Sequence, residues 1–356
     1  MKKIVLVGKD INDLKILAKE NGEPSFRGEQ IFRWIYKDKI DSIEKMSNLS
    51  DSFRQKLMRS VQINSITLEK FQTSKIDGTI KMLFKLYDGK KIESVIIPPR
   101  ETAKDFEKRL TICISTQVGC PLDCNFCATA TMGFERNLTS GEIIEQIIIA
   151  EKYFNKNITN IVFMGMGEPM LNFENVFKAC DIISSQKGME ISPKKITIST
   201  AGYADAIKKM ADNNRKENLA LSLHSLDDAK RTKIMPITKK YSVEKLVDAL
   251  KYYTSKTKNN IMLEYILFRD FNDTEKDIQL ISKLNNLIPL RVNIIPFHDI
   301  SFTQNAKYGS DLKSADKSEI DSFALKLRDK GVLVFTRNSS GVDIDAACGQ
   351  LAISSK

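Results

Sequence analysis

The chain is poor in histidine and has no long apolar run. Its 356 residues include only two histidines, His224 and His298. No window of about 18 apolar residues occurs, so the sequence lacks the signal that predicts a membrane-spanning helix. The short apolar stretch within residues 1–8 is also much shorter than the core of a secretion signal. We therefore expect a soluble, cytoplasmic protein with no membrane partner.

Cysteine is sparse as well, and half of it is crowded into one loop. Of six cysteines, Cys120, Cys124 and Cys127 form a C-x3-C-x2-C motif, which does not resemble a disulfide framework and suits a reducing compartment. The last two alone fit a redox dithiol or half of a zinc site. A structural zinc site needs a fourth ligand, usually from a second cysteine or histidine pair, and the chain has no such pair. The third cysteine favours a four-iron cluster with one iron left open for chemistry.

The excess of basic residues indicates a polyanionic partner only weakly. There are 55 Lys and Arg against 45 Asp and Glu, a net charge of +10. Basic clusters can contact the phosphates of a nucleic acid, but a lysine-rich solvated surface accounts for them equally well. The clusters are Arg27 and Arg33 with Lys37 and Lys39, Lys194 with Lys195, Lys230 and Arg231 with Lys233, and Lys239 with Lys240.

The periodicity of apolar residues divides the chain into zones. Residues 10–60 show helical periodicity, whereas residues 64–100 alternate like strands around a turn at Asp88 and Gly89. This pattern predicts a small helical domain and a linking β-hairpin ahead of a larger core. The predicted units are a helical accessory domain at 1–62, a hairpin linker at 63–104, a barrel at 105–340 and a C-terminal segment at 341–356.

From Leu110 onward, apolar strands alternate with amphipathic helices, as is typical of parallel β-α units. Thr139 and Glu142 form a capping box that opens one helix, and Asp273 is predicted to cap another. Six such units predict an α/β fold, a partial (β/α)6 barrel whose reacting groups follow the carboxyl ends of the strands. The predicted strands are 110–115, 159–164, 195–199, 219–223, 262–267 and 291–296.

Small and polar residues follow these strands in turn. A lone histidine beside an apolar strand is more often a core residue, so His224 fits that interpretation too. The convergence of several such residues at one edge nevertheless favours a ligand pocket. The residues at the strand ends are Gly165, Gly167 and Glu168 after the second strand, Ser199 at the third, Ser222, Leu223 and His224 at the fourth, and His298 after the sixth.

Longer motifs resemble the RlmN/Cfr family of radical S-adenosylmethionine RNA adenine methyltransferases, along nearly the whole chain. The cysteine loop and the turn after the second predicted strand are similar to those of the radical S-adenosylmethionine (SAM) superfamily, and the other motifs narrow the resemblance. They are EPSFRGEQIF at 23–32, TQVGCPLDCNFCAT at 116–129, GFERNL at 133–138, MGMGEP at 164–169, SLH at 222–224, MPITKKY at 235–241 and DIDAACGQL at 343–351.

The resemblance implies methylation of an unreactive aromatic carbon with two molecules of SAM. One gives its methyl group to a cysteine thiolate, which by resemblance is Cys348. The other binds the open iron of a 4Fe–4S cluster held by Cys120, Cys124 and Cys127 and is cleaved to a 5′-deoxyadenosyl radical. That radical takes a hydrogen atom from the S-methyl group, and the resulting carbon radical adds to adenine.

A general base and a second cysteine then resolve the protein–RNA thioether. By resemblance, Glu93 accepts the adenine proton, and Cys113 attacks the Cys348 sulfur, which leaves a disulfide. From the residues alone, Glu93 is the polar face of a hairpin strand. Cys180 has no such role, because its helical spacing predicts a small buried hydrophobe.

The same resemblance places SAM on the residues that follow the strands. Gly167 and Glu168 are expected to bind its amino group. One position departs from the family, which often has asparagine where this chain has His298, although an imidazole makes one of the hydrogen bonds of an amide. The remaining pocket positions are Ser199, Ser222, Leu223 and His224.

The RNA substrate depends on the branch of the family. RlmN-like enzymes methylate C2 of an adenine in the peptidyl transferase centre of 23S rRNA, and often C2 of adenine 37 in tRNAs. Cfr-like enzymes methylate C8 of the same rRNA adenine. Ile295 with Pro296, and Gly133 with Phe134, favour the RlmN branch. Expected partners are 23S rRNA, tRNA and a flavodoxin- or ferredoxin-type reductant, acting with a monomeric enzyme.

The helical domain and the basic clusters are the expected RNA contacts, through shape and phosphates. Outside this family, a ferredoxin-like electron carrier is the alternative. Such a carrier needs a fourth cluster ligand near the loop and no pocket at the strand ends.

Overall fold

A computed structural model describes residues 3–99, 109–303, 307–309 and 311–353 of the chain. The core of the chain is a ten-stranded mixed sheet. All six strands predicted for the barrel are present and pair in parallel. In sheet order they are β6 (Thr111–Cys113), β9 (Asn160–Phe163), β10 (Ile196–Thr200), β11 (Asn218–Ser222), β12 (Ile261–Leu267) and β13 (Leu290–Pro296). The α/β partial-barrel fold predicted from the sequence is therefore confirmed.

One further parallel strand, β14 (Val334–Thr336), lies beyond β13. The sequence did not indicate it, because three residues are too short for a recognisable alternation and one of them, Phe335, is exposed. This strand brings the C-terminal part of the chain alongside the barrel. Arg337 follows it directly and donates its backbone N–H to Ile294 O at 2.9 Å.

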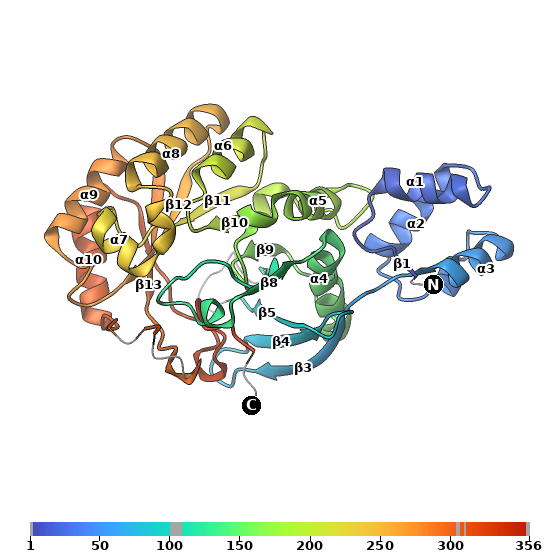
Figure 1. Ribbon diagram of the computed structural model, residues 1–356, viewed down its shortest axis with the longest axis horizontal. Coiled ribbons are helices and arrows are strands. Elements are labelled where there is room, and N and C mark those ends of the chain that lie inside the picture. Colours follow the sequence, from blue (N-terminus) through green and yellow to red (C-terminus); the bar gives the residue numbers. More distant parts are fainter. Residues whose placement is uncertain (1–2, 100–108, 304–306, 310, 354–356) are drawn as a thin grey trace.

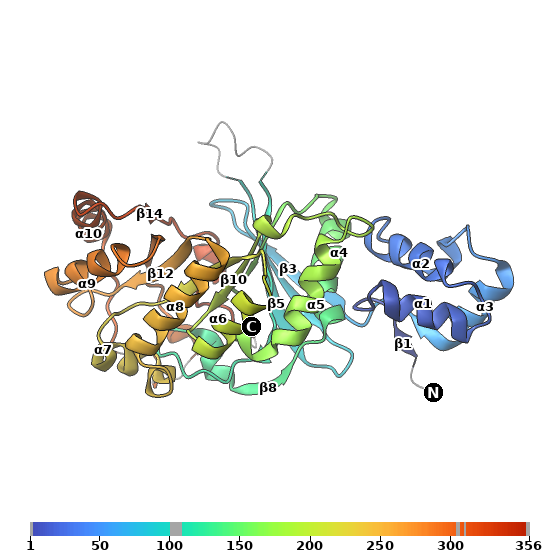
Figure 2. The ribbon, with the colours of Figure 1, turned by 90° about the horizontal axis from the view of Figure 1, so that it is seen from above.

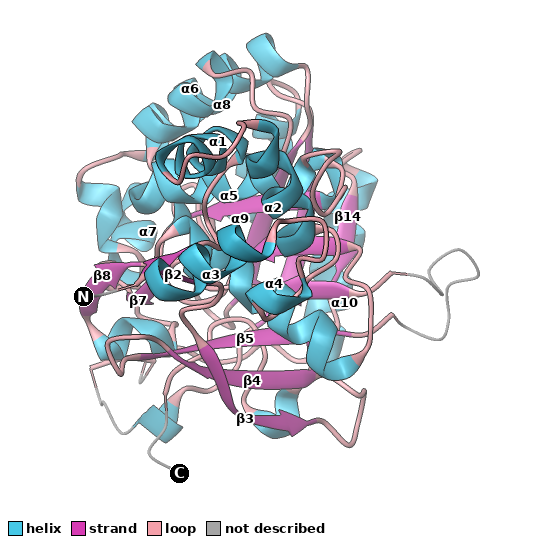
Figure 3. Cartoon of the chain, turned by 90° about the vertical axis from the view of Figure 1, so that its right-hand side faces the viewer, coloured by secondary structure: helices cyan, strands magenta, loops and turns pink. Residues whose placement is uncertain are grey.

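The predicted hairpin is present and also continues the barrel sheet. Strands β3 (Thr67–Thr73), β4 (Ile80–Lys85) and β5 (Lys91–Ile97) pair antiparallel, and β5 pairs antiparallel with β6, so that Val95 faces Cys113. Figure 3 shows β3, β4 and β5 side by side at one edge of the sheet. Glu93 is thereby placed one strand away from Cys113. The boundary expected at 104–105 lies outside the described residues.

Within the described part of the chain, seven helices flank the barrel strands, and α4, α5, α6 and α8 lie together along one side of the sheet (Figure 2). Helix α4 opens with the predicted capping box of Thr139 and Glu142. None of the helices among the described residues is long and apolar enough to span a membrane. Their bounds are α4 (Ser140–Phe154), α5 (Phe173–Ser184), α6 (Ala204–Asp212), α7 (Asp228–Ile234), α8 (Val243–Thr257), α9 (Glu275–Asn285) and α10 (Lys317–Asp329).

The cap predicted for α9 at Asp273 is wrong by one residue. Thr274 caps the helix and forms a capping box with Asp277 at the third helical position. Asp273 instead accepts a hydrogen bond from the backbone N–H of Asp270 at 3.0 Å. Aspartate and threonine are both good N-caps. Thr274 is favoured here because the Asp277 carboxylate accepts hydrogen bonds from its backbone N–H and its hydroxyl.

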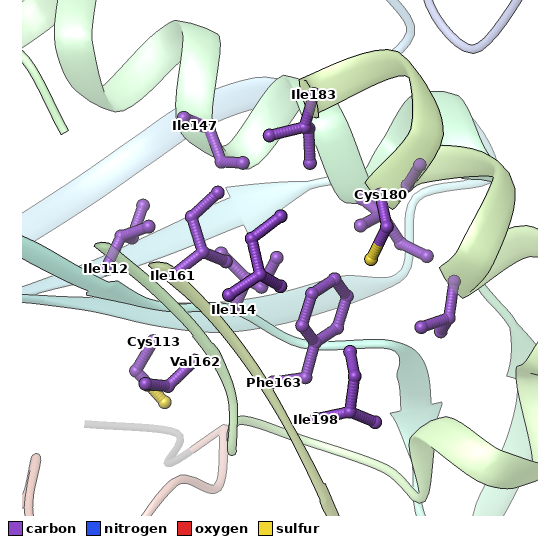
Figure 4. Close-up of a cluster of buried hydrophobic side chains, with 14 of the residues drawn as sticks. Ile112, Cys113, Ile114, Ile147, Ile161, Val162, Phe163, Cys180, Ile183 and Ile198 are labelled. Carbon is purple, nitrogen blue, oxygen red and sulfur yellow. The ribbon is translucent and has the colours of Figure 1, made fainter. Parts of the chain in front are cut away.

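The two faces of the central strands differ, because successive side chains of a strand point to opposite sides. Ile112 and Ile161 point toward the helices, where Cys180 is fully buried among them (Figure 4). Cys180 is thus the buried hydrophobe that its spacing predicts. Cys113 and Val162 point to the other face, into the barrel. The two thiols therefore lie on opposite faces of the sheet, Cys180 on the helix side and Cys113 on the side of the site.

The accessory domain, made of β1, α1, α2, α3 and β2, lies at one end of the molecule beside α4 (Figure 1). Besides the predicted helices it contains a short parallel pair that joins its first and last segments. Tyr36 is completely buried and ties the first segment to α2, since its hydroxyl accepts from Gly8 N at 2.8 Å and donates to Lys9 O at 2.9 Å. The elements are β1 (Ile4–Val5), α1 (Ile11–Glu20), α2 (Phe26–Tyr36), α3 (Asp51–Ser60) and β2 (Val61–Gln62).

The accessory domain contacts the start of α4 through backbone, and ion pairs join it to the barrel elsewhere, among them Lys178 with Asp13 at 2.6 Å and Lys39 with Glu151 at 2.7 Å. A Cβ on Gly141 would lie 2.4 Å from Val7 O, and one on Gly8 would lie 2.4 Å from Gly141 N. Just beyond the domain, the buried carboxylate of Glu145 accepts from the backbone N–H groups of Ser65 and Ile66 at 2.8 and 2.7 Å. The first turns of α4 therefore form part of the surface that contacts the accessory domain and the residues that follow it.

Replacing Gly141 with alanine tests this contact, because two effects predict opposite signs. Helix propensity favours alanine over glycine, whereas the added Cβ must push Val7 away. We expect a loss of about 1–3 kcal/mol of stability from overpacking. Thermal unfolding of the Gly141→Ala variant measures this loss, and a variant more stable than the wild type would contradict the close contact.

Candidate active site

The cluster loop, residues 120–127, follows the carboxyl end of β6 and is held at both ends. Strand β7 (Gln117–Gly119) leads into it, and Gly119 has φ of +70°; a Cβ there would lie 1.8 Å from Gly133 O. Cys120 donates its N–H to Gly133 O at 2.8 Å. After the loop, Ala128 N donates to Gly349 O at 2.6 Å, and the Thr129 hydroxyl donates to Leu351 O at 2.6 Å. The C-terminal segment therefore packs directly against the loop.

The three thiols of the loop suit a metal cluster better than a free state. Burial raises the pKa of Cys120 to about 12 and also raises that of Cys124 and Cys127, and the neighbouring thiols add to the effect at Cys120 and Cys124. Cationic iron would offset this penalty, because it binds the thiolate form. Among the described residues no three metal-binding side chains converge on one point. A cubane cluster does not require that, since each cysteine binds a different iron.

Glu168 lies at the carboxyl end of the second strand, buried and oriented by backbone. Its two oxygens accept from Met170 N at 3.0 Å and Ala201 N at 2.8 Å, while its own N–H donates to the Gln117 side chain at 2.8 Å. A carboxylate has about four acceptor positions, so room remains for an amino group. Burial raises the pKa of Glu168 to about 7. Gly167 is required beside it, because its φ is +98° and a Cβ would lie 2.5 Å from Gln117.

His224 combines the core and the pocket interpretations. Its φ is +56°, its Nδ1 accepts from Ile266 N at 3.0 Å, and its ring contacts Phe126 of the cluster loop at 4.7 Å between centroids. Burial, with a further contribution from Arg231, lowers the pKa of His224 to about 3, so the ring is neutral. Because Nδ1 accepts, the proton is on Nε2, which leaves one donor for a ligand.

Arg231 corrects the interpretation of the basic cluster around it. It is fully buried and cannot contact RNA. Its guanidinium donates to Leu223 O at 3.0 Å, Ala201 O at 2.6 Å and Ser222 O at 3.1 Å, and to the Thr238 hydroxyl at 2.8 Å. Arg231 therefore joins the carboxyl ends of β10 and β11. This role could not be predicted from the sequence, because every residue has a backbone carbonyl and such acceptors leave no pattern of residue types.

The other predicted pocket residues occupy their expected strand ends. Ser199 pairs with Ala220, Ser222 pairs with Glu264, and the buried Leu223 donates its N–H to Glu264 O at 3.0 Å. His298 is half-buried, and its Nε2 is hydrogen-bonded to the Ser339 hydroxyl, beyond β14. Burial lowers the pKa of His298.

Cys113 and Cys348 line one cavity, together with Cys127 of the cluster loop, and we call it the thiol cavity. Cys113 is buried, which raises its pKa to about 12, whereas Cys348 is exposed. The structure thus brings together two cysteines that are 235 positions apart in the chain, from Cys113 to Cys348. Arg337 and Met164 also line this cavity.

Arg337 is the residue of the thiol cavity that sequence reasoning missed. Its Nη1 lies 3.9 Å from Cys348 Sγ and 4.0 Å from Met164 Sδ. The electrostatic influence of Cys348, then of Glu264 and Cys113, raises the pKa of Arg337 against the opposing effect of burial. Its charge lowers the pKa of Cys113, against the larger effect of burial. Its only sequence signal is a place eleven residues before Cys348.

Glu93 is buried on β5, and its Oε2 has no hydrogen-bond partner among the described residues. Burial raises its pKa to about 7, and Lys81, 3.9 Å from Oε1, opposes the shift. The backbone N–H of Ala352 also lowers it, so Glu93 lies close to the C-terminal segment. A carboxyl with a free oxygen and a near-neutral pKa is well suited to accept a proton.

Comparison with known proteins agrees with the site. A model of the radical SAM superfamily matches residues 114–281, and a model of the ribosomal RNA large subunit methyltransferase N-terminal domain matches residues 4–63. A solved radical SAM methyltransferase from Sphaerobacter thermophilus is 32% identical, with a TM-score of 0.89 over 98% of this chain and 99% of that chain. Fold and site thus define a radical SAM methyltransferase.

The curated relatives are more specific. A probable dual-specificity RNA methyltransferase RlmN from Flavobacterium psychrophilum is 41% identical over 96% of this chain and 97% of its own. One from Clostridium botulinum strain Alaska E43 is 40% identical over 96% and 94%. The chain therefore belongs to the RlmN family of radical SAM RNA methyltransferases. This membership confirms the predicted enzyme class, the 4Fe–4S cluster and SAM, and it rules out the electron-carrier alternative.

The buried state of Glu93 predicts a pH-dependent stability difference for Glu93→Gln. The pKa of Glu93 is near 4.5 when unfolded and about 7 when folded, so the wild type loses stability as the pH rises through about 7. The variant should be more stable than the wild type at pH 8, by up to about 3 kcal/mol, and similar at pH 4. Anaerobic thermal unfolding of cluster-loaded protein measures the difference.

Glu69→Gln is the matched control, on β3 of the same antiparallel set of strands. Its hydrogen bond with Lys91 lowers the pKa of Glu69, so this substitution should bring no gain at pH 8. An equal gain in both variants would show that burial of Glu93 is not the cause.

Proposed function

We propose that this enzyme methylates C2 of an adenine in 23S rRNA and of adenine 37 in tRNAs, through an S-methylated Cys348 and a transient protein–RNA thioether. The observation that carries the proposal is the thiol cavity, in which Cys113, Cys348 and Cys127 are lining residues. A methyl carrier, a resolving thiol and a cluster ligand are needed at one place, and these three thiols meet that requirement. The dual specificity in the names of the relatives supports both RNA substrates.

Cys120, Cys124 and Cys127 would hold the cluster, and the strand-end residues would hold SAM. When bound, this pair supplies the 5′-deoxyadenosyl radical that removes a hydrogen atom from a methyl group. Glu168 would accept from the amino group of SAM beside Gly167, and the Nε2–H of His224, which the bond at Nδ1 leaves available, would be a donor to the ligand. The other pocket positions are Ser199, Ser222, Leu223 and His298, of which His298 keeps only Nδ1 for the ligand because Ser339 occupies Nε2.

The exposed thiol of Cys348 is suited to accept a methyl group, and the Arg337 guanidinium lies 3.9 Å from its Sγ. Cys113 would later attack the Cys348 sulfur, which breaks the bond to RNA and forms a disulfide. Its high pKa means that it reacts slowly unless Arg337 stabilises the thiolate. The same guanidinium thus lies beside Cys348 and lowers the pKa of Cys113.

Glu93 would accept the C2 proton of the adenine adduct. Its unpartnered Oε2 and its pKa of about 7 support this role, since a base is most effective when its pKa is near the working pH. A flavodoxin- or ferredoxin-type protein would supply the electron. C8 methylation of the same base is the alternative, and the resemblance to the RlmN branch at Ile295 with Pro296 and at Gly133 with Phe134 favours C2.

Incubation of anaerobic holoenzyme with 23S rRNA and tRNA transcripts tests the proposal. We expect 2-methyladenosine in digests of both RNAs, measured by mass spectrometry against both methyladenosine standards. A digest that contains 8-methyladenosine would assign the enzyme to C8 chemistry. Absence of any methylated adenine, with an intact cluster and active SAM cleavage, would overturn the proposal.

Replacing Cys113 with alanine should trap the thioether, because methyl transfer starts but the second thiol is missing. We expect a covalent protein–RNA band on a denaturing gel, absent for Cys348→Ala. Cys180→Ala removes a thiol outside the cavity and should retain turnover. Release of fully methylated RNA by the Cys113 variant would remove that cysteine from the role.

A further inference from the structure

A second cavity of about 930 Å³ lies at the opposite end of the barrel from the cluster loop. Its described lining contains seven basic side chains and one acidic side chain, Glu264. We call this region the basic mouth, and apart from Arg337 none of its lining residues has a part in the proposed chemistry. The basic residues are Arg109, Lys194, Lys195, Lys216, Lys258, Arg291 and Arg337.

The strand order of the barrel explains why these charges meet. Parallel strands bring all their amino ends to one edge of the sheet. Lys195 directly precedes β10, Lys216 lies two residues before β11, and Lys258 lies three residues before β12. Arg109 lies two residues before β6, and Arg291 is the second residue of β13. Residues far apart in the sequence thereby form one ring of positive charge.

The charges of the basic mouth are available to a ligand. Lys194, Lys195, Lys258 and Arg291 are exposed, and none of them forms an ion pair with any described residue. Elsewhere on the described surface, lysines are often paired, as Lys230 is with Asp277 at 2.8 Å. Unpaired cations that converge on one opening attract a polyanion.

Amide side chains lie between the cations. An amide carries both a donor and an acceptor and can bond to ribose hydroxyls or base edges as well as to phosphate. Asn218 and Asn293 are already oriented by hydrogen bonds, to Lys194 O at 2.7 Å and to Glu264 Oε2 at 2.7 Å. The amides of the lining are Asn160, Asn218, Asn259, Asn260 and Asn293.

The basic mouth adjoins the thiol cavity. Val162, Met164 and Arg337 line both, together with Ile97 and Ser340. Val162 and Cys113 pair in neighbouring strands and point to the same face (Figure 4). A group that passes inward through the basic mouth therefore reaches Arg337 and Met164 first and the two thiols next. The cluster loop borders the thiol cavity from the carboxyl ends of the strands, through Cys127.

We propose that the RNA substrate enters the barrel through the basic mouth, an inference that rests on the proposed function. Phosphates on either side of the target nucleotide contact Lys194, Lys195, Lys258 and Arg291, and the extruded adenine extends past Met164 and Arg337 to the thiols. RNA is favoured over an acidic reductant protein, because an electron donor must approach the cluster loop at the opposite ends of the strands. Of the basic clusters in the sequence, only Lys194 and Lys195 line this opening.

Charge reversal at the basic mouth is the test, with anaerobic, cluster-loaded full-length enzyme. The variants are Lys194→Glu with Lys195→Glu, and Lys258→Glu with Arg291→Glu. The matched control is Lys208→Glu with Lys245→Glu, which are exposed lysines on α6 and α8 without ion pairs among the described residues. Each variant changes the net charge equally, so a purely non-local effect of charge is the same in all three.

Affinity for a tRNA transcript and for an rRNA hairpin is measured across a salt series. At about 0.1 M salt we expect the mouth variants to bind about tenfold more weakly or worse, and the slope of log Kd against log salt to fall by about 1 to 2. The control should change less than about twofold by the same reasoning. The cluster spectrum and the RNA-independent cleavage of SAM should match the wild type in every variant, which shows that the fold is intact.

The outcomes separate this inference from the proposed function. If the wild type methylates RNA and the mouth variants bind it as the control does, the entry route is wrong and the function stands. If the wild type methylates no RNA, the proposed function fails. If the variants bind RNA normally and lose turnover with flavodoxin but not with dithionite, the basic mouth is the reductant site, which also overturns the inference.

Discussion

The attachment of the C-terminal segment to the cluster loop is the constraint on which the site depends. Two short hydrogen bonds join the loop to the residues that follow Cys348, from Ala128 N to Gly349 O and from the Thr129 hydroxyl to Leu351 O. They place that thiol in the same cavity as Cys127 and Cys113. The chemistry proposed for Cys348 therefore depends on a contact that lies outside the β-α units.

The barrel separates two kinds of chemistry along its axis. The carboxyl ends of the strands carry the thiols and carboxylate that suit iron and SAM, and the amino ends carry the cations of the basic mouth. Arg337 lies between them, since it lines both cavities. An anionic substrate and a radical-generating cofactor can thus occupy the barrel together without competing for one entrance. The buried Arg231 holds β10 and β11 together on the cofactor side.

Much of this structure could be predicted from local sequence patterns, whereas the rest depends on contacts between residues far apart in the chain. The six barrel strands, the capping box of α4 and the burial of Cys180 follow from periodicity and caps within a few residues. The error at Asp273 is of the same local kind, because two adjacent residues compete for one cap. Arg231 and Arg337 were beyond reach, since their partners are backbone carbonyls and sulfurs brought close only by folding. The basic mouth was not predicted, because its cations lie before different strands, far apart in the sequence. They come together only when the strands form one sheet.

At Gly8 and Gly141 the backbone of the accessory domain contacts the backbone of α4 directly. Side chains can slide and change rotamer, whereas two backbones in contact have no such freedom. Together with the ion pairs of Lys39 with Glu151 and of Lys152 with Asp41, this contact restricts movement of the accessory domain relative to α4. If an RNA contacts both the accessory domain and the barrel, the distance between those two contacts is fixed. A tRNA and a ribosomal segment would then both have to match that distance, so the size of the RNA would be selected before any base is recognised.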